Sequence, residues 1–411
     1  MVLRVRHPRS AVAGAVALTL PWLAVRALGV SLGPAVTVAV SGVAVLGAAF
    51  LLTWGAETAE KDVPREFAIA VLAIIAVAPE YAVDALYAWE AGVAPGSPAS
   101  LRAADLAVAN MTGANRILIG LGWSGIALFA IYRGTEAVEQ RAGFLADTLV
   151  LDRDLSLEIV FLFAATAYAV FVPFGGIDAV DAVVLVGLYA TYVAILLRSE
   201  GGEHPTAGVP AYLQSFPTVP RRVAILALFA FSAAVILLAV KPFAYGLEAL
   251  GLAVGIDPFL MIQWVAPLAS ESPEFIACLY LVNKARSSSA FNALVSSKLN
   301  QWTLLIGTLV VVYTISLGYY DALRFSRRQM GEVWLTAAQS LFAVSLLTNL
   351  KMSGREALAL LALFLAQFHP VFRTYEGLLA YSVLYLVLAA ALLVKRRHHL
   401  PGLVASARER L

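Results

Sequence analysis

The sequence predicts an all-α protein that crosses a membrane about twelve times and contains two inverted repeats. Three observations lead to this prediction. Of the 411 residues, 61% are hydrophobic and only 14% are charged, whereas soluble globular proteins carry about 25% charged residues. Apolar runs near the membrane-spanning length of about 20 residues recur along the chain. A Pro-Glu pair occurs once in each half, as Pro79-Glu80 and Pro273-Glu274.

The apolar runs are predicted to be helices. Inside a bilayer every backbone N–H and C=O must be hydrogen-bonded within the protein, which leaves helices or closed barrels. Barrel strands alternate apolar and polar residues over about 10 positions, but these runs are continuously apolar. The expected spans are residues 11–30, 33–55, 65–90, 104–132, 156–173, 178–198, 223–250, 258–282, 291–317, 332–350, 355–371 and 375–395.

The first apolar run follows a basic segment and could be read as a signal peptide. However, Pro21, Trp22 and Arg26 follow without a convincing small-residue cleavage site, and a second run begins almost at once. We therefore expect the run to be retained as the first span.

Basic residues predict the orientation. Lys and Arg are concentrated in the loops that share a side with the N-terminus, and basic loops face the cytoplasm. Both termini are therefore expected in the cytoplasm, with the protein embedded in the cell membrane. Residues 199–222 are rich in Gly and Pro and predict a cytoplasmic linker between an N-terminal half, 1–198, and a C-terminal half, 223–411.

Composition excludes several classes of partner and cofactor. The net charge of +2 does not favour nucleic acid. A single cysteine, Cys278, excludes an internal disulfide framework and a cysteine-based metal cluster. The five histidines form no cluster in the middle of a span, so no cofactor is expected. The expected partners are the lipid bilayer and a transported ion, and the sequence indicates no particular oligomeric state.

The two halves of the chain are similar in the order of their landmarks. Pro79-Glu80-Tyr81 corresponds to Pro273-Glu274-Phe275, and further on Asn115 with Gly122 corresponds to Asn300 with Gly307. The Pro-Glu spans are the third and the eighth, so they run in opposite directions through the bilayer. Such inverted repeats are typical of secondary transporters. We expect the repeats at about 65–132 and 258–317, with five core helices and one extra helix in each half.

Glu80 and Glu274 are the main candidates for chemistry. A carboxylate in the middle of a membrane is costly and usually faces a polar cavity that handles ions or protons. Proline removes a helical hydrogen bond, so Pro79 and Pro273 should leave carbonyl oxygens free beside each carboxylate. Carboxylate and carbonyl oxygens are the ligands that hard cations prefer. The alternative is a kinked helix whose glutamate pairs with a neighbouring base, which is less expected for two related copies.

Other polar residues lie near the two glutamates in the predicted spans. Asp84 lies one turn after Glu80, and Glu271 lies one turn before Glu274, so each pair shares a helix face. Further candidates for cation or proton binding lie on these spans or on the spans that follow them: Ser270, Asn110, Asn115, Asn300 and Lys298.

These motifs resemble the Ca²⁺/cation antiporter superfamily, which includes the sodium/calcium and cation/proton exchangers. Its members carry two inverted repeats, each with a Thr-Ser-x-Pro-Glu helix followed by a Gly-Asn-x-x-Gly-Ser-Asn helix. The corresponding segments here are 76–80 (AVAPE) with 109–115 (ANMTGAN), and 270–274 (SESPE) with 298–300 (KLN). The resemblance implies that Glu80 and Glu274 ligate the transported cation. It also implies that transport proceeds by alternating access.

Several positions depart from the family pattern. In the first repeat Ala76 and Val77 replace the hydroxyl ligands, and Ala114 replaces a serine. Glu271 replaces a serine of the second repeat. The positions where the family places a further Asn or Asp hold Leu118 and Thr303, and Lys298 replaces a glycine. The shell of oxygen ligands for Na⁺ and Ca²⁺ is therefore incomplete.

We predict a secondary cation antiporter that exchanges Ca²⁺ or Na⁺ for H⁺ or Na⁺. The alternative is a degenerate member in which Lys298 and Arg116 act as internal cations, with another solute or a role outside transport. An intramembrane enzyme is not favoured because the spans contain no paired catalytic motif. A channel is not favoured because it does not require titratable carboxylates in inverted repeats.

Overall fold

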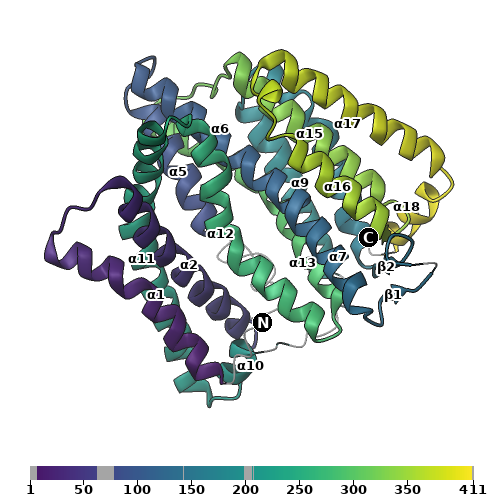
Figure 1. The fold of residues 1–411 in the computed structure, drawn as a ribbon, viewed down its shortest axis with the longest axis horizontal. Helices are drawn as coiled ribbons and strands as arrows, with labels where there is room; N and C mark the ends of the chain where they lie inside the picture. The colour runs from purple at the N-terminus through teal and green to yellow at the C-terminus, as the bar shows by residue number, and fades with distance from the viewer. Residues whose placement is uncertain (1–6, 63–77, 142, 199–205, 207, 410–411) are drawn as a thin grey trace. The chain divides into compact units, whose positions relative to one another are not determined.

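The computed structural model of the protein describes residues 7–62, 78–141, 143–198, 206 and 208–409 (Figure 1). The chain forms two compact units, residues 1–86 with 199–273 and residues 87–198 with 274–411. The divisions fall inside the two Pro-Glu helices, α5 (Ala78–Val93) and α12 (Pro258–Asn283). The first half of the predicted third span, residues 65–77 with Ala76 and Val77, lies outside the described residues, as do residues 199–205 and 207 of the predicted linker.

The first unit is a helical bundle with α2 and α11 at its centre. Its complete helices are α1 (Pro8–Leu28), α2 (Pro34–Ala59), α10 (Val209–Gln214) and α11 (Thr218–Val254). Proline occupies the first turn of both α1 and α2. A backbone N–H in the first turn has no partner within the helix, so proline, which lacks this group, costs no hydrogen bond there. Figure 1 shows α1 and α2 beside α11. The Trp22 indole of α1 donates to the carbonyl oxygen of Leu238 in α11 at 3.1 Å.

The second unit contains the larger set of helices. Its elements outside the Pro-Glu helices are α6 (Pro98–Ile117), η2 (Leu118–Trp123), α7 (Ser124–Arg133), β1 (Val138–Glu139), β2 (Thr148–Val150), α8 (Leu155–Ala169), η3 (Val172–Phe174), α9 (Ala179–Arg198), α13 (Ser287–Asn300), η4 (Gln301–Leu305), α14 (Ile306–Leu317), α15 (Arg327–Leu346), β3 (Lys351–Ser353), α16 (Gly354–Ala366), η5 (Pro370–Arg373), α17 (Tyr375–Lys395) and α18 (Leu400–Arg408).

A small antiparallel sheet of order β1-β2-β3 joins two loops of the second unit. Leu149 pairs with Val138 on one side and with Met352 on the other. Near the opposite end of α8, an isolated bridge pairs Ile177 with Leu323. The loops before α8 and after α15 therefore meet at one end of this unit, and the loops after α8 and after α14 meet at the other.

Asn115 and Asn300 lie on two long helices, residues 98–133 (α6, η2 and α7) and residues 287–317 (α13, η4 and α14), which we call the asparagine helices. These two helices run in opposite directions. Helix 98–133 ends beside the start of α13, where the hydroxyl oxygens of Thr135 and Ser287 lie 2.8 Å apart. Near the other end, the Ser326 hydroxyl, which follows α14, donates to Asp105 of α6 at 3.2 Å. Helix 98–133 thus ends near the start of α13, and the loop that follows α14 returns to α6. The predicted inversion of the repeats is confirmed for these helices.

Nine helices within the described residues are long and apolar enough to cross a membrane. They coincide with nine of the twelve predicted spans. The predicted span 332–350 falls largely within α15, a helix with many buried polar side chains, and the predicted span 355–371 within α16, which has 13 residues. The predicted span 65–90 is described only from Ala78 onward, as α5. The count of twelve therefore stays a prediction, whereas the all-α membrane fold is confirmed.

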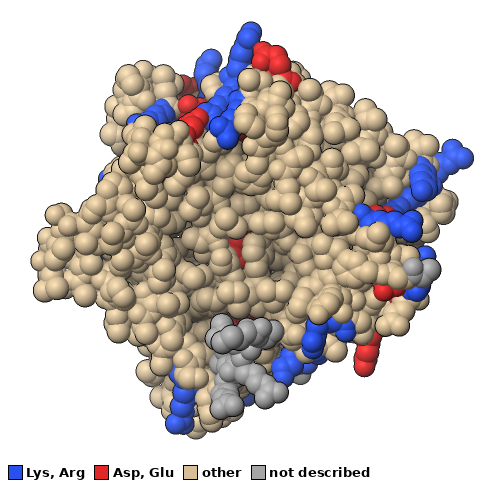
Figure 2. Space-filling view, viewed as in Figure 1, with Lys and Arg blue, Asp and Glu red and all other residues tan. Residues whose placement is uncertain are grey.

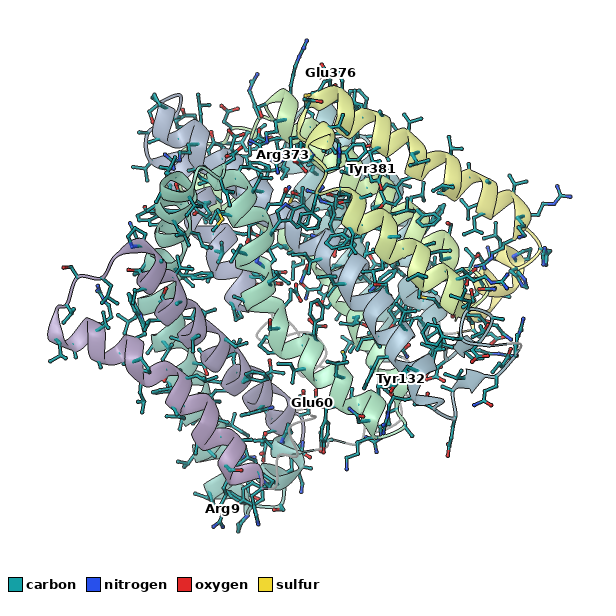
Figure 3. All side chains as sticks on the ribbon, viewed as in Figure 1. Arg9, Glu60, Tyr132, Arg373, Glu376 and Tyr381 are labelled. Carbon is teal, nitrogen blue, oxygen red and sulfur yellow. The ribbon has the colours of Figure 1, made fainter. Side chains whose placement is uncertain are left out.

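The surface of α17 illustrates the distribution of charge along a membrane-facing helix. Figure 3 labels Arg373 and Glu376 near its start, and Lys395 ends it. No charged residue lies between Glu376 and Lys395, and the surface over this helix is uncharged between its two ends (Figure 2). Exposed Val383 and Val387 belong to this stretch. Such a helix suits contact with lipid tails.

Candidate functional site

Four of the predicted site residues lie in the first unit, on α5 and α12. Glu80 and Asp84 are 3% and 1% exposed, and Glu271 is also buried. The Ser270 hydroxyl of α12 lies 3.4 Å from the Glu80 carboxylate oxygen Oε1, at the long limit of a hydrogen bond. The structure therefore places a serine hydroxyl beside the first Pro-Glu carboxylate, as a cation site built from oxygen atoms requires.

The second Pro-Glu carboxylate lies in the other unit and also faces a serine. Ser297 of α13 donates its hydroxyl to the Glu274 oxygen Oε2 at 3.0 Å. Glu274 is half-buried and Ser297 is buried. Each Pro-Glu carboxylate thus has a serine hydroxyl as a neighbour, Ser270 for Glu80 and Ser297 for Glu274. The sequence prediction included Ser270 but not Ser297 among the site residues.

The asparagine helices of the two repeats meet through Lys298. The Nζ atom of Lys298 donates to the Oδ1 atom of Asn115 at 2.7 Å and lies 4.1 Å from the centre of the Trp302 ring. Lys298 and Asn115 are both fully buried. The amide of Asn115 donates in turn to the carbonyl oxygen of Met111 at 2.8 Å.

The other two predicted asparagines are also buried. Asn110 is 2% exposed, on α6. Asn300 is 3% exposed and donates its amide to the Tyr189 hydroxyl of α9 at 3.1 Å. Four predicted site residues therefore belong to the second unit and are buried on the two asparagine helices: Asn110, Asn115, Asn300 and Lys298.

Both asparagine helices change to π-helix directly after the motif. The first π segment covers Leu118–Trp123 and the second covers Gln301–Leu305. π-helical turns are rare in proteins, and those that do occur are often found at functional sites. The first segment begins three residues after Asn115 and the second directly after Asn300, so they lie at similar places in the two repeats. The sequence prediction missed them because hydrophobic periodicity does not distinguish one π-turn within an α-helix.

A second buried ionic group lies beside this region and was also missed. The Arg116 guanidinium pairs with Glu332 of α15, and both side chains are almost fully buried. Gln367 accepts from Arg116 at 3.4 Å and donates to Gln339 and Tyr385, both at 2.9 Å. In the alternative prediction of a degenerate member, Arg116 acts as an internal cation, and the structure pairs its positive charge with Glu332.

The donor set suits a hard cation and not a soft metal. Within the described residues no group of three or more His, Cys, Asp or Glu side chains converges as a ready-made metal site. The candidate oxygens come instead from single carboxylates with hydroxyl and amide neighbours. Such oxygens match the preference of Ca²⁺, which also takes backbone carbonyl and water ligands.

A model of the family described as sodium/calcium exchanger protein matches residues 33–198 and 224–368. The chain belongs to the sodium/calcium exchanger family. It is a cation antiporter and an integral membrane protein, with inorganic cations as substrates.

One solved structure supports the same assignment, and two others share the fold. The chain is 43% identical to the structure described as the H⁺/Ca²⁺ exchanger CAX, over 98% of both chains and with a TM-score of 0.89. It is 16% identical to the sodium-calcium exchanger NCX_Mj, over 82% of this chain and 98% of that chain, with a TM-score of 0.52. Native YfkE is 14% identical over 92% and 99% of the two chains, with a TM-score of 0.58. The last two likenesses concern the fold alone. No curated protein matches the chain.

Proposed function

We propose that this antiporter exchanges Ca²⁺ for H⁺ across the cell membrane, by alternating access at Glu80 and Glu274. The observation that carries the proposal is the 43% identity, over 98% of both chains, to a structure described as an H⁺/Ca²⁺ exchanger. The two carboxylates supply a chemical reason for this exchange. A carboxylate binds either protons or Ca²⁺, so the two ions compete for the same oxygens.

The ligand set favours protons over Na⁺ as the counter-ion. An exchanger that couples Ca²⁺ to Na⁺ needs oxygen ligands for Na⁺ in addition to those for Ca²⁺. Ala114 and Leu118 provide no side-chain oxygen, and Thr303 donates its hydroxyl to the carbonyl oxygen of Leu299 at 2.6 Å. Proton binding requires the carboxylates alone. The roles of Glu80 and Glu274 as metal ligands, with Asp84, Glu271, Ser270 and the asparagines around them, are part of this proposal.

Lys298 supplies a fixed positive charge within the proposed site. A buried ammonium group that donates to Asn115 occupies space and hydrogen-bonding capacity that a second metal ion would need. It therefore favours a site that takes one divalent cation in exchange for protons. If the protein transports no cation under any gradient, the alternative of a degenerate family member is favoured.

The test is a flux measurement with the purified full chain in liposomes. Ca²⁺ uptake is followed with a trapped indicator while a gradient of pH, Na⁺ or K⁺ is imposed in turn. The proposal expects saturable Ca²⁺ uptake driven by the pH gradient, with matching proton movement in the opposite direction. Uptake driven by Na⁺ but not by pH would overturn the choice of proton. A conductance without counter-ion dependence would indicate a channel.

The membrane arrangement belongs to the same proposal: two halves, 1–198 and 223–411, joined by a cytoplasmic linker at 199–222, with both termini in the cytoplasm. Residues 138–150 and 351–353, predicted to face the cytoplasm, pair in one sheet. Labelling of single cysteines placed in these strands and in the linker, in a Cys278→Ser background, tests the orientation. Labelling of any of them from outside intact cells contradicts it.

A further inference from the structure

Gln339 of α15 is a fully buried side chain that contacts the backbone next to the proposed site, and the exchange mechanism above gives it no role. Its amide nitrogen Nε2 donates to the carbonyl oxygen of Arg116 at 3.3 Å. Arg116 directly follows Asn115 and lies two residues before the first π segment. The Gln339 amide therefore holds the backbone close to the junction between α-helix and π-helix.

Three buried residues close a ring of hydrogen bonds around this contact. Arg116 donates from Nη1 to the Gln367 oxygen Oε1 at 3.4 Å, and Gln367 donates from Nε2 to the Gln339 oxygen Oε1 at 2.9 Å. Gln339 closes the ring at the Arg116 carbonyl oxygen. A guanidinium group can only donate, whereas an amide side chain has one acceptor and one donor end. Gln367 must therefore turn its oxygen to Arg116, which leaves the nitrogen of Gln339 for the carbonyl oxygen.

Helix α15 holds Arg116 at two points. Glu332, two turns before Gln339 on α15, pairs with the Arg116 guanidinium, while Gln339 binds the carbonyl oxygen of the same residue. Helix α15 packs against α6 and lies beside α17 (Figure 1). The Tyr385 hydroxyl of α17 accepts from Gln367 at 2.9 Å and so joins the ring to a further helix. Arg116 can move relative to α15 only if one of these buried bonds breaks.

The two repeats supply a side-chain donor near their π segments in different ways. A change from i→i+4 to i→i+5 bonding shifts the backbone hydrogen bonds by one residue, so a carbonyl oxygen near the junction needs another donor. In the second repeat Thr303 donates to the carbonyl oxygen of Leu299 at 2.6 Å, within its own helix. The corresponding residue of the first repeat is Leu118, which has no polar side-chain atom. The first repeat therefore depends on Gln339, a residue of another helix, for this donor.

We propose that Gln339 is a positioning residue of the exchanger, which fixes the backbone of Arg116 and thereby the place of Asn115 in the cation site. The inference rests on the proposed function, because Asn115 is part of the site only in that proposal. Asn115 accepts from the buried ammonium group of Lys298 at 2.7 Å and shares a peptide bond with Arg116. A displacement of Arg116 therefore moves Asn115 and the ammonium group that it holds. Since a misplacement of about 1 Å can impair a site strongly, loss of the Gln339 donor weakens Ca²⁺ binding.

Helix α15 also provides a matched control. Thr336 is fully buried and lies three residues before Gln339. Its hydroxyl donates to the carbonyl oxygen of Glu332, within the same helix, at 2.7 Å. Thr336→Val therefore removes a buried donor from α15 without removing a hydrogen bond to Arg116. If Gln339 acted only through the stability of α15, the two substitutions would have the same effect on transport.

The experiment compares Gln339→Met and Gln367→Met with Thr336→Val in the full chain. Ca²⁺ uptake by liposomes under a pH gradient is measured over a series of Ca²⁺ concentrations, which separates KM from the maximal rate. We expect KM to rise about threefold to tenfold in Gln339→Met, the factor that one hydrogen bond typically represents. The maximal rate should stay close to that of the wild type, because saturating Ca²⁺ compensates for a lower affinity. Gln367→Met opens the same ring and should also raise KM, whereas Thr336→Val should not.

Hydrogen exchange of the backbone, followed by mass spectrometry of the protein in detergent, reports on position directly. Gln339→Met should exchange faster than the wild type in residues 111–123, which include Asn115 and the first π segment. Residues 287–305, which include the second π segment, should be unchanged. A general loss of stability would instead raise exchange in both segments.

Each outcome decides the proposal. A wild-type KM in Gln339→Met, or an equal rise of KM in Gln339→Met and Thr336→Val, would overturn the role of Gln339 and leave the exchange function intact. If Gln339→Met does not fold, Gln367→Met takes its place, and an unchanged KM in that variant overturns the proposal. A wild-type protein without proton-driven Ca²⁺ uptake would overturn the proposed function, and this inference with it.

Discussion

Lys298 donates a hydrogen bond of 2.7 Å from its Nζ atom to the Oδ1 atom of Asn115, so the asparagine helices of the two repeats meet at a buried ammonium group. The aromatic face of Trp302 lies on the same ammonium group, 4.1 Å from ring centre to Nζ. A cation over an aromatic ring is stabilised electrostatically. The positive charge of Lys298 is thus held in place by one residue of the first repeat and one of the second.

Replacement of Lys298 by methionine should alter the pH dependence of exchange while Ca²⁺ still binds. Methionine preserves the length of the side chain and removes its charge. Without a nearby cation, carboxylates hold protons more tightly, so half-maximal Ca²⁺ uptake should move to higher pH and proton-driven exchange should weaken. The measurement is Ca²⁺ uptake by liposomes across a pH series, with Lys395→Met, an exposed lysine at the end of α17, as control. An unchanged pH profile in Lys298→Met would show that its charge does not act on the site.

Glu80→Gln and Glu274→Gln should each abolish Ca²⁺ uptake. An amide retains the shape of the side chain but carries no negative charge and cannot exchange a proton for a metal ion. We expect uptake equal to that of liposomes without protein, with thermal unfolding close to that of the wild type. Glu376→Gln, at the exposed start of α17 (Figure 3), is the control and should leave uptake unchanged. Wild-type uptake in either active-site variant would exclude that glutamate as an essential ligand.

The sequence predicted the helical architecture well because long apolar runs have few alternatives in a membrane. Nine predicted spans correspond to nine helices of the described residues. The inverted arrangement followed from Pro-Glu and Asn landmarks in the same order, and the antiparallel asparagine helices agree with it. Glu80 and Ser270 were both predicted as site residues because they lie on the two Pro-Glu motif helices, and the structure places the Ser270 hydroxyl 3.4 Å from the Glu80 carboxylate.

The contacts between distant residues could not be predicted. Arg116 and Glu332 are separated by 216 residues, and no sequence motif contains both of them, so their pairing could not be read from the sequence. The sheet at 138–150 and 351–353 was missed because its strands have two or three residues, too few to show a period. The π segments were missed because one additional residue in a turn leaves composition unchanged. Gly120 and Gly122, which lie within the first π segment, were the available signal for that segment alone.

The Arg116–Glu332 pair should be required for stability, since both side chains are buried. Glu332→Gln removes the negative charge and leaves the guanidinium buried without a counter-charge, which typically costs about 3–5 kcal/mol. We expect a clear fall in the melting temperature in detergent. The double variant Arg116→Met with Glu332→Leu removes both charges and should recover much of the loss, because apolar replacements of a buried pair are often tolerated. A double variant less stable than Glu332→Gln would contradict this account.

Gly120→Ala should destabilise the protein, whereas Gly125→Ala, five residues later, should not. A Cβ atom at Gly120 would lie 2.1 Å from Cγ of Phe364 in α16, but a Cβ atom at Gly125 would meet nothing within 4 Å. Overpacking of this kind typically costs about 1–3 kcal/mol. Alanine at an open helical position gains up to about 1 kcal/mol over glycine. Thermal unfolding of the two variants tests the contrast, and equal melting temperatures would mean that α16 can move to accommodate the methyl group.

Asp62 should make the stability of the first unit depend on pH. It follows α2 outside the membrane-spanning helices, and Arg221 donates to both of its oxygens, Nε to Oδ2 at 2.5 Å and Nη2 to Oδ1 at 2.7 Å. The Arg221 guanidinium holds the pKa of Asp62 below its usual range. An unfolded Asp has a pKa of about 3.9, so the unfolded state binds more protons. The ion pair therefore stabilises the fold above about pH 4, and this contribution is lost as the pH falls through the folded-state pKa.

Asp62→Asn should lower the melting temperature at pH 7, since hydrogen bonds to charged groups contribute about 1.5–3 kcal/mol. The difference between the wild type and Asp62→Asn should narrow as the pH falls below about 4, because the unfolded carboxyl group binds protons there before the folded one does, and the charge contribution is gone below the folded-state pKa. Arg222→Ala is the matched control, because Arg222 lies 3.2 Å from the same carboxylate but is 60% exposed. Exposed ion pairs contribute about 0–1 kcal/mol, so this variant should melt nearly as the wild type does. A difference between the wild type and Asp62→Asn that stays constant from pH 7 to pH 3 would show that the charge of Asp62 is not the source of its stabilisation.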